Sequence, residues 1–111
     1  MRSQHELRLG LTLPFPLGRQ WTNLAQIVRL EGLGNYTLIH FLDGTTLLVA
    51  LSLKVFMGRV PVGVFVRPHR KHLLNRQHIE TVSARHGNIL LTNGERIPIA
   101  RRRVTEFRRV G

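Results

Sequence analysis

The sequence contains no cysteine, few aromatic residues and few acidic residues. Without cysteine, the 111-residue chain can form no disulfide, no thiolate zinc site and no iron–sulfur site, and it has no cysteine nucleophile. No run approaches the ~18 apolar residues of a membrane-spanning helix, and the segment after Met1 does not lead into a signal-peptide core. The length fits one domain. These absences favour a soluble, cytoplasmic protein with no membrane partner.

The scarcity of acidic residues leaves a large positive charge. The chain has 17 Lys and Arg against 6 Asp and Glu, a formal net charge of +11. Residues 59–111 hold 12 of the basic residues and 3 of the acidic ones. Solubility does not need so uneven a distribution. The charge therefore indicates a polyanionic partner, which is nucleic acid, an anionic membrane surface or an acidic protein.

Short segments of alternating apolar and polar residues predict a mostly β fold with two short helices. Asp43-Gly44 and Asn93-Gly94 are typical hairpin turns, since both residue types tolerate positive φ. The expected strands are 27–30, 36–42, 45–49, 64–67, 79–84, 88–92 and 96–99, and the expected helices are 51–60 and 101–110. The pattern predicts a single domain over residues 23–111.

Residues 1–22 are expected to form an N-terminal arm. A strand could run from Glu6 to Leu13, where leucines alternate with other residues. The segment from Leu13 to Gly18 contains two prolines, and we expect it to be irregular.

Two basic clusters, in residues 67–76 and 101–109, carry most of the positive charge. Arginine suits phosphate and guanine recognition because its planar guanidinium can donate two parallel hydrogen bonds. If the fold brings the two clusters together, they form one binding surface. Charge alone does not say which polyanion that surface would bind.

The histidines of the first cluster raise two alternatives. His69 and His72 would share one face only in a helix, which Pro68 disfavours, and the next carboxylate in the sequence is Glu80. A pair acting as general acid and base is chemically feasible, but spacing cannot show the required placement. No nucleotide-binding loop or nucleophile elbow is present. We therefore predict a protein that is not an enzyme and that needs no metal or cofactor.

The aromatic residues distinguish between kinds of nucleic acid. Phe41, Phe56, Phe65 and Phe107 occupy apolar-periodic positions and are expected in the core. Tyr36 differs, because it follows Gly34-Asn35 at the start of a strand and is expected to be exposed. Single-strand binders stack bases on several exposed aromatic rings. The sequence therefore favours duplex DNA, and the alternative is a small basic RNA- or ribosome-associated binding module.

Four ordered blocks resemble the LytTR DNA-binding domain, the output module of many bacterial response regulators. The strongest block, Phe65 to Asn75, is similar to the family signature F-x-R-x-H-x-x-x-x-x-N. The other blocks are residues 31–37 with 43–44, residues 52–54, and residues 93–102. Two residues depart from the family pattern: Pro68 replaces a small apolar residue and Ala100 replaces a common serine.

The resemblance implies short antiparallel sheets whose loops enter successive major grooves and bend the DNA. Base reading would fall to Tyr36, Arg70 and Arg102. The residues implied to contact phosphates are Asn35, His69, Lys71, Arg76, Arg101, Arg103, Arg108 and Arg109. For Asn75, a contact to DNA and a structural role in tying down the loop both remain open.

The predicted function is that of a stand-alone transcriptional regulator that binds specific duplex DNA and has no receiver domain of its own. The signal would then come from a separate signalling or receiver protein, or from the expression level. Pairing of two chains on repeated half-sites fits the resemblance.

Overall fold

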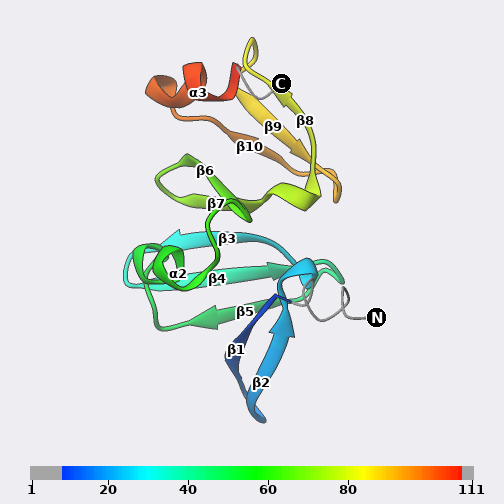
Figure 1. Cartoon of the computed structure of the whole chain (residues 1–111), viewed down its shortest axis with the longest axis vertical. Helices are drawn as coiled ribbons and strands as arrows, with labels where there is room; N and C mark the ends of the chain where they lie inside the picture. The colour runs from blue at the N-terminus through cyan, green and yellow to red at the C-terminus, as the bar shows by residue number, and fades with distance from the viewer. Residues whose placement is uncertain (1–8, 109–111) are drawn as a thin grey trace.

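The structure is a computed structural model that describes residues 9–108, without the side chain of Arg108. It is mostly β, as predicted, and all its strand pairs are antiparallel (Figure 1). The strands are β1 (Gly10–Phe15), β2 (Gly18–Asn23), β3 (Ile27–Leu33), β4 (Tyr36–Phe41), β5 (Thr46–Val49), β6 (Phe65–His69), β7 (His72–Asn75), β8 (Ile79–Ser83), β9 (Asn88–Leu91) and β10 (Arg96–Pro98). The helices are α2 (Leu53–Arg59), α3 (Val104–Arg108) and the 3-10 helices η1 (Leu24–Gln26), η2 (Arg76–His78) and η3 (Arg101–Arg103).

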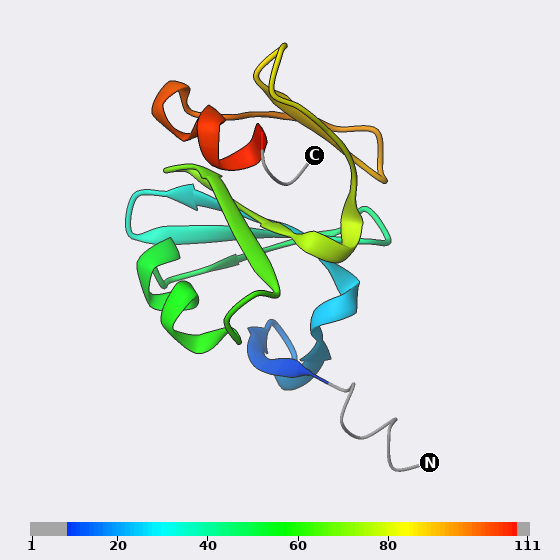
Figure 2. The same ribbon diagram turned by 45° about the horizontal axis from the view of Figure 1, so that its top comes forward.

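The elements form three layers around a five-stranded sheet with the strand order β5-β4-β3-β7-β6. The β1–β2 hairpin and α2 pack on one face of this sheet, and the three-stranded sheet β10-β9-β8 packs with α3 on the other face. Figure 2 shows the small sheet above the central sheet, with the β1–β2 hairpin below it. No helix in the described part of the chain is long and apolar enough to cross a membrane.

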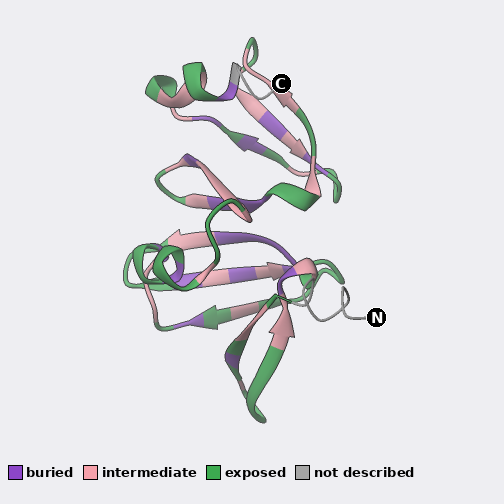
Figure 3. Ribbon diagram, viewed as in Figure 1, coloured by how far each residue is buried: buried purple, intermediate pink, exposed green. Residues whose placement is uncertain are grey.

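The central strands β3 and β7 place apolar side chains on both faces because both faces are covered. Ile27 and Leu73 enter the core on the α2 side, whereas their neighbours Val28 and Leu74 enter the core under the small sheet. Figure 3 shows the buried residues within the strands and the exposed residues at the turns and on the outer side of α2.

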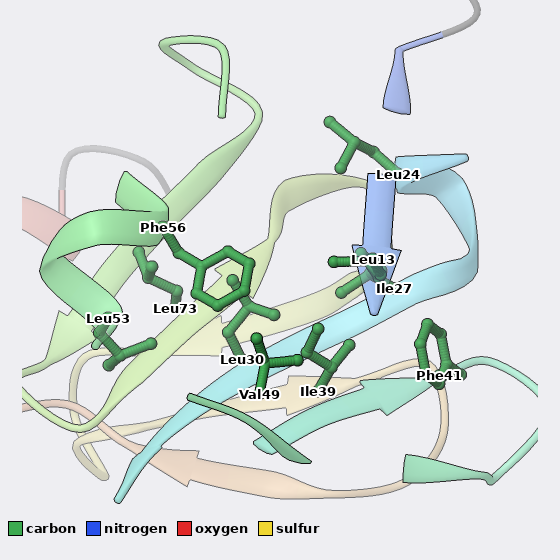
Figure 4. Close-up of a cluster of buried hydrophobic side chains, with 10 residues drawn as sticks. All are labelled: Leu13, Leu24, Ile27, Leu30, Ile39, Phe41, Val49, Leu53, Phe56 and Leu73. Carbon is green, nitrogen blue, oxygen red and sulfur yellow. The ribbon is translucent and has the colours of Figure 1, made fainter. Parts of the chain in front are cut away.

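The larger core lies between the central sheet, α2 and the β1–β2 hairpin (Figure 4). Its buried members are Leu13, Leu24, Ile27, Leu30, Ile39, Phe41, Val49, Leu53, Phe56 and Leu73. The smaller core contains Val28, Leu74, Ile89, Leu91, Ile97, Ile99 and Phe107. The predicted core positions of Phe41, Phe56 and Phe107 are confirmed, and Phe65 is half-buried against the larger core.

The expectation that residues 13–18 are irregular is wrong. Residues 10–23 form the β1–β2 hairpin, in which Pro14 pairs with Arg19 and Phe15 pairs with Gly18. A proline is tolerated here because each strand of a two-stranded sheet has one free edge, where a missing N–H breaks no ladder bond. Leu13 anchors the hairpin in the larger core with 2% of its surface exposed. The strand predicted over 6–13 is observed over 10–15, and residues 6–8 lie outside the described residues.

The two predicted helices and both predicted glycine turns are confirmed. Ser52 caps α2 through a hydrogen bond from Val55 N to its Oγ (3.3 Å). The second helix begins as the 3-10 turn η3 and continues as α3. Gly44 and Gly94 both have φ of 90°, a conformation that glycine adopts at little cost.

Candidate nucleic-acid interface

Several turns and helix starts, most of them with basic residues, lie along one side of the molecule. The β3–β4 turn (residues 34–35), the β6–β7 turn (residues 70–71), the start of α2 and η3 are all on the left in Figures 1 and 2. We call this side the basic edge. The turns meet there because β3 and β6 run toward this side, and β4 and β7 return from it.

The β3–β4 turn, the start of α2 and the β6–β7 turn surround a shallow depression. Its lining residues are Gly32, Gly34, Ser52, Leu53, Lys54, Arg67, Arg70 and Lys71. Gly32 N donates to Lys71 O (2.8 Å), which links the two turns. A Cβ at Gly32 would lie 2.9 Å from Leu53 Cδ1. The close approach of β3 to α2 therefore depends on glycine at this position.

The β6–β7 turn has no glycine and is held by side-chain bonds instead. Arg67 Nη2 donates to Arg70 O (2.6 Å), and Arg67 Nη1 donates to Met57 Sδ on α2 (2.8 Å). Lys71 N donates to His69 Nδ1 (3.1 Å). These bonds fix the backbone of the turn and leave the side chains of Arg70 and Lys71 exposed.

Helix η3 is attached to the same hairpin. Ala100 N donates to Pro68 O, and Arg103 Nη1 donates to Arg67 O, both at 2.7 Å. Pro68, one of the departures from the family pattern, is fully buried under this contact. Arg101 and Arg102 are exposed beside the hairpin. The backbone segments that carry the two basic clusters are therefore joined directly by hydrogen bonds.

Most of the predicted site residues are brought together at the basic edge. Tyr36 is 49% exposed at the start of β4, next to exposed Asn35. The predicted residues gathered there are Asn35, Tyr36, His69, Arg70, Lys71, Arg101, Arg102 and Arg103. Arg109 and the side chain of Arg108 lie outside the described residues.

Arg76 is not at the basic edge. It begins η2 at the other end of β7, and its Nε donates to Gly63 O (3.0 Å). A strand of four residues separates it from the 70–71 turn by roughly 13 Å. The sequence grouped Arg76 with the 70–71 turn only because they are close along the chain.

Asn75 has a structural role. Its Nδ2 donates to Leu24 O and Ile27 O, at 3.0 and 2.9 Å, and its Oδ1 accepts from Gln77 N at 3.0 Å. With 1% of its surface exposed, the side chain ties η1, β3 and η2 together inside the fold. Of the two roles considered for Asn75, a DNA contact and a structural role, the structure therefore supports the structural one.

The two histidines of the first cluster lie close together, with ring centroids 5.5 Å apart. Glu31 pairs with His72 across β3 and β7. The sequence analysis missed this nearby carboxylate because it lies 41 positions before His72 in the chain. Burial, and then the charge of Arg29, lowers the pKa of His72. Within residues 9–108, no group of three or more His, Asp or Glu side chains is placed to hold a metal ion.

A partly buried ion pair joins the central sheet to the small sheet. Arg29 donates through Nε to Glu95 Oε1 and through Nη2 to Glu95 Oε2, both at 2.9 Å. Glu31 Oε1 lies 3.4 Å from Arg29 Nη1 and 2.9 Å from His40 Nε2. The hydrogen bonds from Arg29 outweigh desolvation and lower the pKa of Glu95 to about 2. The network extends from Glu31, which pairs with His72 beside the 70–71 turn, to Glu95 at the β9–β10 turn.

Lys54, Arg85 and His86 also line the surface near the predicted site, although the sequence analysis did not select them. Lys54 shares the depression with Arg70 and Lys71. Lys54 lies in the Ser52-Leu53-Lys54 block of the family resemblance, so the sequence did contain an indication of its place at the site. Arg85 and His86 come from the β8–β9 turn, where no motif pointed to them.

A small β domain whose turns gather arginine and lysine along one edge has the form of a nucleic-acid-binding module. Residues 20–111 match the family described as the LytTr DNA-binding domain. The chain therefore belongs to this family, and the predicted resemblance is confirmed. Membership supports DNA binding and a role in transcription regulation.

Two relatives show the same likeness. The LytTr DNA-binding domain of a Bacillus cereus protein described as a methyl-accepting/DNA response regulator superposes with a TM-score of 0.73 and 27% identity, covering 91% of this chain and 94% of that one. Sensory transduction protein LytT of Enterococcus faecalis is 30% identical over 71 residues, which are 61% of this chain and 29% of LytT. The matched part is thus under a third of the length of that relative.

Proposed function

We propose that the chain binds specific sequences in duplex DNA by placing the turns of its basic edge in successive major grooves, as the DNA-binding part of a transcriptional regulator. The observation that carries this proposal is the exposed 70–71 turn, flanked on one side by the β3–β4 turn and on the other by η3. Membership of a DNA-binding family supports the choice of DNA as the polyanion.

The order of the turns suits this arrangement. The β3–β4 turn, the 70–71 turn and η3 follow one another along the longest axis of the molecule, which is vertical in Figure 1. Successive major grooves on one face of a duplex are about 34 Å apart. Turns arranged in a row are suited to follow the duplex from one groove toward the next.

The side chains divide into two roles. Arg70 and Arg102 are exposed at the ends of their turns and would read base edges, with Tyr36 as a third reader. Asn35, Lys71 and Arg101 would contact phosphates, which position the protein without reading sequence. His69 and Arg103 each use one side-chain nitrogen within the fold and would reach phosphates through another. Two chains on repeated half-sites would extend the same contacts.

Selection of bound sites from a random duplex library tests this function. The selected duplex, a scrambled duplex and a structured RNA are then titrated by fluorescence anisotropy at one salt concentration. We expect the selected duplex to bind on the order of 10³-fold more tightly than the scrambled one. Equal binding to both duplexes would refute sequence specificity, and tighter binding to the RNA would favour the RNA-associated alternative.

A further inference from the structure

A second depression lies beside η3, on the side away from the 70–71 turn. Its lining residues are His69, Ala84, Arg85, His86, Gly87, Pro98, Ile99, Ala100, Arg101 and Val104. The charged and titratable members of this set are two arginines and two histidines, and none of its members is acidic. The proposed function gives no role to the β8–β9 turn (residues 84–87), which supplies Arg85 and His86.

Internal hydrogen bonds occupy Nδ1 of both histidines. His69 Nδ1 accepts from Lys71 N (3.1 Å), so its ring proton is on Nε2 when the ring is neutral. Ser83 Oγ accepts from His86 N (3.2 Å) and lies 2.8 Å from His86 Nδ1, which holds the ring in place. Nε2 of each ring is left for a partner. Since both arginines are donors and His69 presents an Nε2–H, donors predominate among the polar side chains named here.

The position of the β8–β9 turn is fixed by the strand that leads to η3. Ile99 N donates to Gly87 O (2.8 Å), and the next residue, Ala100, bonds to Pro68 on β6. The β8–β9 turn is consequently held above η3, at the top of Figure 1. Arg85 and His86 are exposed there.

We propose that this depression binds a backbone phosphate of the same DNA, on the flank of the segment contacted by the basic edge. A phosphate matches a set of donors that includes two guanidinium groups. Duplex DNA is the source of that phosphate because Arg101 and His69 belong both to the depression and to the basic edge. The inference rests on the proposed function, and it adds a fourth contact, from the β8–β9 turn.

Arg85→Ala is the first test, measured with the selected duplex. We expect on the order of 10-fold weaker binding at low salt and a decrease of about 0.9 in the slope of log affinity against log salt. The base preference from library selection should stay the same, because a phosphate contact reads no sequence. His86→Ala should show a smaller loss of the same kind. An unchanged salt slope with Arg85→Ala would overturn the proposal.

Neutral methylphosphonate linkages, placed one at a time along each strand of the selected duplex, locate the contact. One flanking linkage should weaken wild-type binding as much as Arg85→Ala does, and the variant should be insensitive to that linkage. If the variant loses affinity equally on every modified duplex, Arg85 acts through net charge alone and the proposed site is wrong.

Arg96→Ala is the matched control. Arg96 is exposed on the same small sheet, but it starts β10 next to the β9–β10 turn, at the opposite end from Arg85. The Arg96→Ala substitution removes the same charge as Arg85→Ala. It should leave the sensitivity of binding to each methylphosphonate position unchanged. A wild-type chain that shows no preference for any duplex would refute the proposed function itself. Specific binding that is identical in wild type and Arg85→Ala would refute only the fourth contact.

Discussion

The turns on the two sides of the molecule, at opposite ends of the central strands, hold their charged side chains differently. At the basic edge, Arg70 and Lys71 are exposed at the end of their hairpin. At the other edge, on the right in Figures 1 and 2, the β4–β5 turn carries Asp43 and the β9–β10 turn carries Glu95. Asp43 Oδ1 accepts from Thr45 N and Oγ1, at 2.9 and 2.6 Å, and Glu95 is bound to Arg29.

This difference shows that charged residues on one side of the fold contribute to stability, whereas those on the other side are free to bind a partner. The two carboxylates opposite the basic edge use their hydrogen bonds to shape turns and to join the two sheets. The exposed cations at the basic edge add little to folding and remain available to a partner.

The largest expected effect is the loss of stability on breaking the ion pair between Arg29 and Glu95. Glu95→Ala leaves Arg29, a residue that is 8% exposed, with only the longer contact to Glu31. Since the side chain of Glu95 is 36% exposed, the free energy of unfolding should fall by about 2 kcal/mol, less than for a fully buried pair. Urea denaturation measures this change. A variant as stable as the wild type would contradict the role given to this pair.

Lowering the pH should remove part of the same stabilisation in the wild-type protein. Since the pKa of Glu95 is lowered from 4.5 to about 2, its contribution to stability is complete above pH 4.5 and is lost as the pH falls toward 2. Urea titrations between pH 7 and pH 2 measure it. Glu95→Gln should be less stable at pH 7 and should show a weaker dependence on pH over this window.

Arg70→Ala should reverse the pattern, since it changes binding and leaves stability alone. The loss of a base-reading arginine should cost roughly 1–3 kcal/mol of affinity for the selected duplex and should relax the preference at one position. The free energy of unfolding should change by less than about 0.5 kcal/mol. Arg76→Ala, at the other end of β7, is the matched control for DNA binding. Equal losses in both variants would count against the assignment of the 70–71 turn.

Lys71→Ala should have a smaller and less selective effect. Its backbone bonds to Gly32 and His69 persist in alanine, so only the charge is removed. Affinity should fall alike for selected and scrambled duplexes, and the salt slope should decrease by about 0.9. Arg59→Ala, exposed at the end of α2, is the control and should leave the slope unchanged. A loss confined to the selected duplex would instead make Lys71 a base reader.

The smallest effect is expected from a substitution that adds a contact. Ala100 is the N-cap residue of η3 and provides no side-chain bond to the first turn. Ala100→Ser restores an acceptor for an N–H of that turn and should raise the free energy of unfolding by about 0.5 kcal/mol. Thermal unfolding measures the change. A decrease in stability would show that the hydroxyl does not fit beside Pro68.

Local patterns were sufficient for most of the fold. The Asp43-Gly44 and Asn93-Gly94 turns and the strands around them depend on neighbouring residues, and they were predicted correctly. The β1–β2 hairpin was missed because Pro14 is tolerated only where a free edge exists, and pairing partners are not visible in a single segment. Strand β7 was hidden among the basic residues of the 67–76 cluster, since its turn uses Arg70 and Lys71 in place of glycine.

The site was predictable where a motif covered it and not where distant strands supply the partners. The signature block located the 70–71 turn. It could not show that β7 carries Arg76 to the other end of the hairpin. The pairing of Glu31 with His72 and the bond from Arg29 to Glu95 both depend on contacts between residues far apart in the chain. Such contacts require the register of the sheets.

Arg67 holds both elements to which base reading is proposed: its guanidinium binds the hairpin turn, and its carbonyl accepts from Arg103 of η3. The orientation of these elements and the DNA sequence that they would prefer therefore depend on different residues. Under the proposed function, exchanging the side chains at positions 70 and 102 should change the preferred DNA sequence while both elements keep their angle of approach. Removal of the Arg67 side chain should loosen the hairpin turn alone, because the carbonyl that holds Arg103 belongs to the backbone.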